Sequence, residues 1–152
     1  MKINECVEVD FLAQLFDDAT VGIVVSDPNK EDNPLIYVNK EFLNMTGYSE
    51  EDCINRNCRF LQGKDTDEST IKVIRSAIKD RTNTNIRIKN YKKNGTAFWS
   101  DLTITPIFDK GQNLKYFLGV QKDITQQVMS EFAAKERIRE LEIEVSKLKR
   151  KA

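Results

Sequence analysis

Three consecutive segments in the second half of the chain alternate apolar and polar side chains with the two-residue period of a β-strand. They cover residues 84–91, 96–107 and 114–123. The apolar face of each segment carries one amide or hydroxyl group, from Asn90, Ser100 and Gln121. These groups either bond to partners scattered within a core or converge on the edge of a ligand. In both cases the alternation predicts a sheet with a buried face.

The loop between the first two of these strands decides their register. A two-residue loop at 94–95 would place Asn90 and Ser100 on opposite faces, because a shift of one residue reverses every side chain. A three-residue loop at 93–95 keeps both on one face. Such loops commonly end in a residue with left-handed backbone geometry, which suits Gly95. We therefore predict the three-residue loop.

The first half of the chain predicts short helices and two further strands. Apolar periodicity, β-branched runs and capping residues indicate the boundaries. The expected elements are a helix over 9–19, strands over 21–27 and 35–39, a helix from Asn39 to Met45 ended by Gly47, a helical turn after Ser49, and a helix over 67–79.

The segment Asn57-Cys58-Arg59-Phe60-Leu61-Gln62 combines a thiol, a cation, two amides and two large apolar side chains. Few core segments need this mixture, because a buried polar group without a partner costs roughly 1–3 kcal/mol. A ligand with a polar edge, an apolar ring system and an anionic end would use all of these groups. The alternative is a helical turn that contains a small buried cysteine.

Composition excludes several functional classes. The 24 basic and 24 acidic residues balance, which argues against nucleic-acid binding. The absence of histidine removes His-ligated haem and Ser-His or Cys-His catalysis. The three cysteines include no CxxC pair, so neither a disulfide framework nor a metal site is expected. The sequence shows no membrane span or signal peptide, and we expect a cytoplasmic protein.

The six-residue segment resembles the flavin-binding signature of LOV photoreceptor domains, Gly-x-Asn-Cys-Arg-Phe-Leu-Gln. Asn55 stands where the signature has glycine, and asparagine tolerates left-handed backbone geometry, so we expect the turn to persist. Other LOV-like segments follow in order: Asp27-Pro28, Asp32-Asn33-Pro34, Tyr37-Val38-Asn39, Thr46-Gly47-Tyr48, Asn90-Tyr91-Lys92-Lys93, Phe98-Trp99 and Gly119-Val120-Gln121-Lys122-Asp123-Ile124-Thr125. The resemblance implies the α+β PAS/LOV fold, an antiparallel sheet with short helices on one face, plus N-terminal and long C-terminal helices.

The resemblance also implies a function. In the LOV family, blue light excites bound flavin mononucleotide (FMN), and the motif cysteine, here Cys58, bonds reversibly to carbon 4a of the ring. Nitrogen 5 gains a proton, and a nearby glutamine, here Gln121, reorients its amide. The expected protein is a blue-light photoreceptor and not an enzyme. The alternative is a PAS module that binds flavin or another small molecule, for redox sensing or partner assembly, without photochemistry.

Residue chemistry suggests how the polar tail of the cofactor would be bound. Arg59 and Arg75 are the candidates for the phosphate, since a guanidinium group can make two parallel hydrogen bonds to it. Asn57 and Gln62 would bond the ribityl chain and its hydroxyl groups. We expect all four side chains to lie around one cavity.

The strands would supply the wall around the ring. Asn90 would meet the uracil-like edge, where an amide can both donate and accept. Ser100 stands where the family usually has a second asparagine, and its shorter side chain is expected to change the absorption maximum or the dark recovery. Gly119 would allow the backbone to approach the ring closely. Phe117 and Val24 complete the expected cofactor-binding residues.

Residues 126–152 predict a continuous, charge-rich helix. Apolar residues at heptad positions a and d form a short coiled-coil seam: Ile138, Leu141, Val145 and Leu148. The flanking charges would attract one another in a parallel homodimer, to which an apolar sheet face at 116, 118 and 120 would contribute. The alternative is a helix folded back on its own domain. The expected division is a helical cap (1–19), a flavin-binding domain (20–125) and this helix, with an unknown downstream effector.

Overall fold

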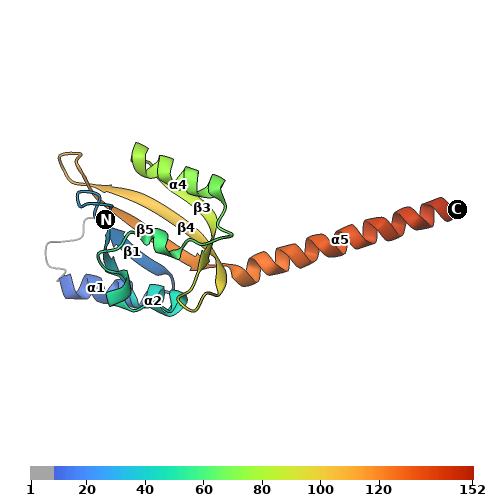
Figure 1. The fold of residues 1–152 in the computed structure, drawn as a ribbon, viewed down its shortest axis with the longest axis horizontal. Helices are drawn as coiled ribbons and strands as arrows, with labels where there is room; N and C mark the ends of the chain where they lie inside the picture. The colour runs from blue at the N-terminus through green and yellow to red at the C-terminus, as the bar shows by residue number, and fades with distance from the viewer. Residues whose placement is uncertain (1–8) are drawn as a thin grey trace.

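The computed structural model describes residues 9–152, in which five strands form an antiparallel sheet (Figure 1). The strands are β1 (Gly22–Ser26), β2 (Leu35–Val38), β3 (Thr84–Tyr91), β4 (Ala97–Phe108) and β5 (Leu114–Asp123). Their order is β2-β1-β5-β4-β3, so β1 and β5 lie side by side although they are far apart in the chain. The predicted α+β fold with an antiparallel sheet is confirmed.

The helices are α1 (Val9–Asp17), α2 (Lys40–Thr46), α3 (Glu50–Cys53), the short 3-10 helix η1 (Cys58–Leu61), α4 (Glu68–Asp80) and α5 (Thr125–Lys151). Side chains from α2, α3 and η1 form one core cluster with strand residues that include Val24 and Phe98. A second cluster joins Ile74 of α4 to strand residues that include Ile88 and Leu102. The short helices therefore cover one face of the sheet. Residues 1–8 of the predicted cap lie outside the described residues.

The register of β3 and β4 follows the predicted three-residue loop. Asn90 pairs with Phe98, and the backbone N–H of Lys92 donates to the carbonyl of Thr96 at 2.8 Å. Gly95 adopts a φ of 85°, which is the left-handed geometry that the loop requires. Asn90 and Ser100 consequently share the buried face of the sheet, as predicted.

Asn39 fixes the start of α2 and ties it to the sheet. Its side-chain Oδ1 accepts hydrogen bonds from the backbone N–H of Phe42 at 3.0 Å and of Ile23 at 2.7 Å. Gly47 ends the helix with a φ of 74°. Asparagine at the cap and glycine at the end were both predicted, and they set the position of the helix against β1.

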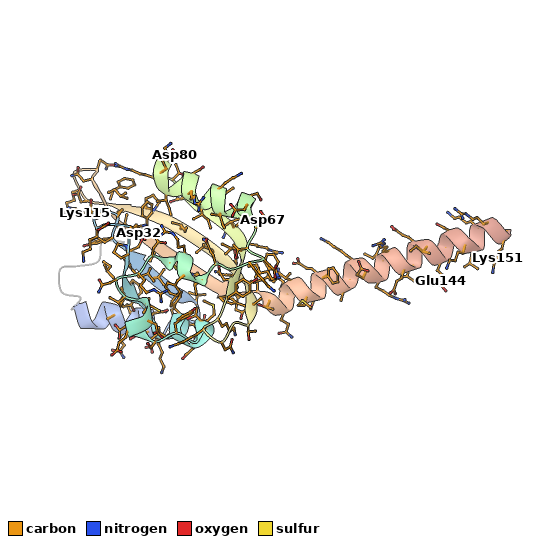
Figure 2. All side chains as sticks on the ribbon, in the orientation of Figure 1. Asp32, Asp67, Asp80, Lys115, Glu144 and Lys151 are labelled. Carbon is orange, nitrogen blue, oxygen red and sulfur yellow. The ribbon has the colours of Figure 1, made fainter. Side chains whose placement is uncertain are left out.

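Helix α5 projects away from the domain (Figure 1), and none of its side chains is buried. Glu144 and Lys151 lie far out on its free end (Figure 2). The helix therefore does not fold back on its own domain, which was the alternative considered from the sequence. Tyr116 on the outer sheet face is 40% exposed, so this face is not fully covered within one chain. From residue 9 onward, no helix has both the length and the apolar character needed to cross a bilayer.

Candidate functional site

A cavity of about 150 Å³ lies between the buried face of the sheet and the helices η1 and α4. Most of its wall surface is apolar, and Phe117 contributes an aromatic ring to it. An apolar cavity of about this volume can hold an aromatic ring. The predicted site residues that line it are Val24, Asn57, Cys58, Arg59, Gln62, Arg75, Asn90, Phe117, Gly119 and Gln121. The fold thus brings residues from both halves of the chain together in one site.

Ser100 is the exception among the predicted site residues. It is fully buried but does not line the cavity. Its hydroxyl donates a hydrogen bond to Oε1 of Gln121 at 3.2 Å. Ser100 therefore lies behind Gln121 as seen from the cavity, because its short side chain ends against the amide of that residue.

Gln121 lies between Ser100 and Cys58. Its Nε2 donates to the sulfur of Cys58 at 3.9 Å, while its Oε1 accepts from Ser100. A hydroxyl and a thiol can each donate or accept a hydrogen bond. A turn of the amide by 180° would therefore keep a partner at both ends, with donor and acceptor exchanged. The side chain of Gln121 therefore has two orientations in which both ends of its amide are hydrogen-bonded.

The Cys58 thiol is protonated at neutral pH. Burial of the sulfur raises its pKa to about 12, against a smaller opposing effect of the hydrogen bond from Gln121. Thiolates, and not thiols, are the ordinary cysteine nucleophiles, and a reactive cysteine usually has a lowered pKa. Cys58 is thus unsuited to ground-state nucleophilic attack and needs a partner that is activated by other means.

Two buried amide oxygens at the cavity wall have no hydrogen-bond partner among the described residues. They are Oδ1 of Asn90 and Oδ1 of Asn33. A buried acceptor left unpaired costs roughly 1–3 kcal/mol, so both positions suit a ligand that carries N–H or O–H donors. A flavin supplies an N–H group on its ring and hydroxyl groups on its ribityl chain. The residues present fit this cofactor.

Asn57 has a structural task beside its place at the cavity. Its Oδ1 accepts from the backbone N–H of Arg59 at 3.0 Å and so caps η1. Its Nδ2 donates to the backbone carbonyl of Asp32 at 2.7 Å. An amide oxygen can accept two hydrogen bonds, so Oδ1 of Asn57 can still take part in the predicted bond to the ribityl chain. Asn57 therefore positions the turn that presents Cys58.

The two predicted phosphate-binding cations both line the cavity where it meets solvent. Arg75 lies exposed on α4, and Arg59 is half-exposed at the start of η1. The guanidinium group of Arg59 is bonded to the carboxylate of Asp32 at 2.6 Å. We refer to Arg59, Arg75 and Asp32 as the charged end of the cavity.

Two backbone positions next to the site are sterically constrained. Asn55 adopts a φ of 64°, so the left-handed turn persists without the signature glycine, as predicted. At Gly119, a Cβ atom would lie 2.7 Å from Cγ2 of Val24, which is too close for any side chain. Glycine here allows β1 and β5 to pack tightly beneath the cavity.

Comparison with known proteins places this cavity in a family. A family model described as a PAS domain matches residues 20–126. A solved LOV domain from the blue-light-activated histidine kinase of Erythrobacter litoralis EL346 is 37% identical, with a TM-score of 0.68. That match covers 70% of this chain and 98% of the solved domain. The chain belongs to the LOV branch of the PAS family.

Other relatives of this LOV domain are also named for light sensing. The blue-light photoreceptor of Listeria innocua is 46% identical over 116 residues, which is 76% of this chain and 46% of the relative. Blue-light-activated histidine kinase 1 of Erythrobacter litoralis is 43% identical over 105 residues, or 69% of this chain and 29% of the relative. A structure from work on a flavin analogue and the light-oxygen-voltage domain mechanism is 34% identical, with a TM-score of 0.73, over 84% of this chain and 95% of that one.

The chain spans less than half the length of these two curated relatives. Their names support blue-light sensing by this LOV domain. The activities of the regions that lie outside the match are properties of those relatives.

Sequence reasoning missed two polar residues of the LOV site. Asn33 was noted only as part of a LOV-like loop, although it lines the cavity and its buried side-chain oxygen has no partner among the described residues. Asp32 was not assigned a role, although its carboxylate holds Arg59. Both lie in one loop, in which Asp32 has a φ of 63° and Asn33 a φ of 47°. The only available signal was the cluster of turn-forming residues before Pro34.

Proposed function

We propose that this LOV domain is a blue-light sensor that binds FMN and forms a reversible bond between Cys58 and carbon 4a of the flavin. The observation that supports this most strongly is the hydrogen-bonded series Cys58–Gln121–Ser100 at the cavity wall. When bound, the flavin would supply light absorption and the electrophilic carbon. All other parts of the mechanism lie in the chain itself.

The polar groups of the wall would hold and orient the cofactor. The unpaired oxygens of Asn90 and Asn33 would accept hydrogen bonds from it, and the apolar wall would exclude water from the ring. Gln62 would bond the ribityl chain. The positive charges of Arg59 and Arg75 would attract the phosphate, since guanidinium groups bind phosphate with charge-assisted hydrogen bonds.

Cys58 would keep its proton until light arrives. The fraction of thiolate falls about tenfold for each pH unit below the pKa. Because the pKa of Cys58 is about 12, less than about one molecule in a thousand carries a thiolate at neutral pH. Bond formation would break the S–H bond of Cys58, and the thiol proton would pass to nitrogen 5 of the flavin. The amide of Gln121 would then face a new donor, so it would turn to present Oε1 to that donor and would bond the hydroxyl of Ser100 through Nε2.

The response of Gln121 would reach α5 along β5. The strand ends at Asp123, and Thr125 begins the helix. The backbone N–H of Trp99 in β4 donates to the hydroxyl of Thr125 at 2.9 Å, and the N–H of Ile124 donates to the carbonyl of Trp99 at 2.8 Å. The start of α5 is thus attached to the two strands that carry Gln121 and Ser100.

We further propose that α5 pairs with a second copy as a parallel homodimer. The predicted seam residues are all exposed in the single chain: Ile138, Leu141, Val145 and Leu148. Two heptads are short for an isolated coiled coil, so the partly exposed outer face of the sheet would contribute to the interface. Cross-linking of a Leu141→Cys variant tests this arrangement. A strictly monomeric protein would contradict it.

The decisive experiment is an absorption spectrum of the purified protein before and after blue light. We expect a flavin band that bleaches on illumination and recovers in darkness, and no bleach in Cys58→Ala. Flavin binding without a bleach in the wild type would favour the alternative of a non-photochemical flavin module. The absence of any bound flavin after reconstitution with FMN would refute the cofactor assignment.

A further inference from the structure

Asp32 holds Arg59 with both oxygens of its carboxylate. Nη1 of Arg59 donates to Oδ2 at 2.6 Å, and Nη2 donates to Oδ1 at 2.7 Å. This is the parallel two-bond geometry in which a guanidinium group also binds phosphate. The carboxylate therefore occupies the face of Arg59 that a phosphate would use. The pKa of Asp32 is lowered by these hydrogen bonds, so the carboxylate is ionised at neutral pH.

The position of Asp32 is built into the loop. Its φ of 63° is uncommon for a residue other than glycine. Its backbone carbonyl accepts a hydrogen bond from Nδ2 of Asn57 at 2.7 Å, next to η1. The loop is thus attached to η1 through both the main chain and the side chain of Asp32. Asp32 lies on the domain and away from the free part of α5 (Figure 2).

The charged end of the cavity carries less positive charge than its lining suggests. Among residues 9–152, two guanidinium groups, those of Arg59 and Arg75, line the cavity, and no carboxylate does. Asp32, just outside the lining, neutralises Arg59, whereas Arg75 forms no ion pair in this part of the chain. A phosphate monoester brings a charge of about −1.5 to −2 at neutral pH. It would have to displace Asp32 from Arg59 or share Arg59 with it.

We propose that Asp32 is a specificity-determining residue that weakens the preference of the site for phosphorylated over phosphate-free flavin. It does so by competing with the ligand phosphate for Arg59. The inference rests on the proposed function and deepens it, because it concerns the class of flavin that the same cavity accepts. The site then admits riboflavin, which carries no phosphate, at an affinity close to that for FMN.

Asp32→Asn is the informative substitution. It removes the charge, retains one oxygen that can accept from Arg59, and suits the left-handed backbone because asparagine tolerates that geometry. Asp32→Gly, which also tolerates it, is the second variant if the first does not fold. Glu31→Gln is the matched control, since it removes an equal charge from the neighbouring residue, and Glu31 forms no ion pair within the described residues.

The measurement is the dissociation constant of the full chain for FMN and for riboflavin, by quenching of flavin fluorescence after reconstitution of the flavin-free protein. We expect Asp32→Asn to tighten FMN binding by about three- to fivefold, as for a partly exposed charge pair. Riboflavin binding should change by less than about twofold on the same scale. The gain should shrink at high salt, because salt screens exposed charges.

The Arg59→Gln background separates competition from other effects. If Asp32 acts through Arg59, the addition of Asp32→Asn to Arg59→Gln should leave the ratio of the two dissociation constants unchanged. An equal loss of affinity for both flavins in Asp32→Asn would show that Asp32 only holds the loop, and would overturn the proposal. A ratio unchanged from the wild type, or an equal shift in Glu31→Gln, would overturn it too. Failure of the wild type, as well as of the variants, to bind either flavin would instead contradict the proposed function.

Discussion

Arg87 on β3 donates two hydrogen bonds to Glu131 on α5, at 2.8 and 3.3 Å, across 44 residues of sequence. Gln127, one turn earlier on α5, donates to the same carboxylate at 3.0 Å. Together with the contacts of Thr125, this pair holds α5 at two points along its axis. The direction in which the helix leaves the sheet therefore depends on a carboxylate.

Protonation of Glu131 should release this contact. The hydrogen bond from Arg87, followed by that from Gln127, lowers the pKa of Glu131 from 4.5 to about 2. A carboxylate whose pKa is lowered in the folded state stabilises the folded contact fully when the pH is above its unfolded-state pKa. It loses this effect as the pH falls through its folded-state pKa. The contact should be constant from pH 5 to 8 and lost between about 4.5 and 2. Distances from a spin label on β3 to one on α5 would measure this. Glu131→Gln should show no such transition, and an equal transition in that variant would exclude this pair as the cause.

Ser100→Asn should shift the flavin absorption maximum or the rate of dark recovery. The longer amide would replace the hydroxyl that bonds Gln121 at 3.2 Å and would extend toward the cavity. Ser100→Ala separates the two effects, because it removes the bond to Gln121 without adding reach. The spectra and recovery rates of the three proteins should all differ. Identical values in the wild type and Ser100→Asn would show that position 100 does not influence the ring.

Gly119→Ala should destabilise the fold. The new Cβ would lie 2.7 Å from Cγ2 of Val24. Overpacking of this kind costs about 1–3 kcal/mol in the free energy of unfolding. Urea denaturation of the flavin-free protein would measure the cost. In the double variant Gly119→Ala/Val24→Ala the clash is gone, so its destabilisation should be less than the sum of the single changes. Strict additivity would argue that the contact is not the cause.

The high pKa of Cys58 predicts two effects of alkaline pH. Alkylation of Cys58, followed by mass spectrometry, should continue to accelerate above about pH 11, whereas a thiol with the ordinary pKa of 9.0 would be almost fully ionised by then and would have reached its plateau. Stability should also fall, because burial raises the folded-state pKa from 9.0 to about 12. Because the folded-state pKa of Cys58 is raised, the contribution of this thiol to the free energy of unfolding is complete below its unfolded-state pKa. That contribution is lost as pH rises from 9 toward 12. Cys58→Ser should lack this part of the alkaline loss. A plateau of alkylation at or below about pH 11 would contradict the burial of the sulfur.

Local patterns were sufficient to predict most of the fold. The alternation in β3, β4 and β5 and the special geometry of Gly47 and Gly95 are properties of short segments, so the sequence contains them directly. The same alternation placed Asn90 and Gln121 on the buried face, and the motif around Cys58 supplied the opposite wall.

Long-range side-chain contacts were not predictable in this way. The bond between Asp32 and Arg59 spans 27 residues and depends on two left-handed residues in a loop. Ser100 does not line the cavity because its hydroxyl bonds Gln121. The alternation of apolar and polar residues predicts only the face of the sheet on which Ser100 lies, and not this partner. Both features follow from tertiary packing, which single-residue preferences do not determine.

The length of α5 makes it a lever arm. The helix runs from Thr125 to Lys151, 27 residues, which corresponds to about 40 Å at about 1.5 Å per residue. A rotation of about 10° at the attachment to β4 and β5 would move the far end by about 7 Å on that length. A rearrangement as small as the turn of one amide can therefore become a displacement comparable to the spacing between packed helices.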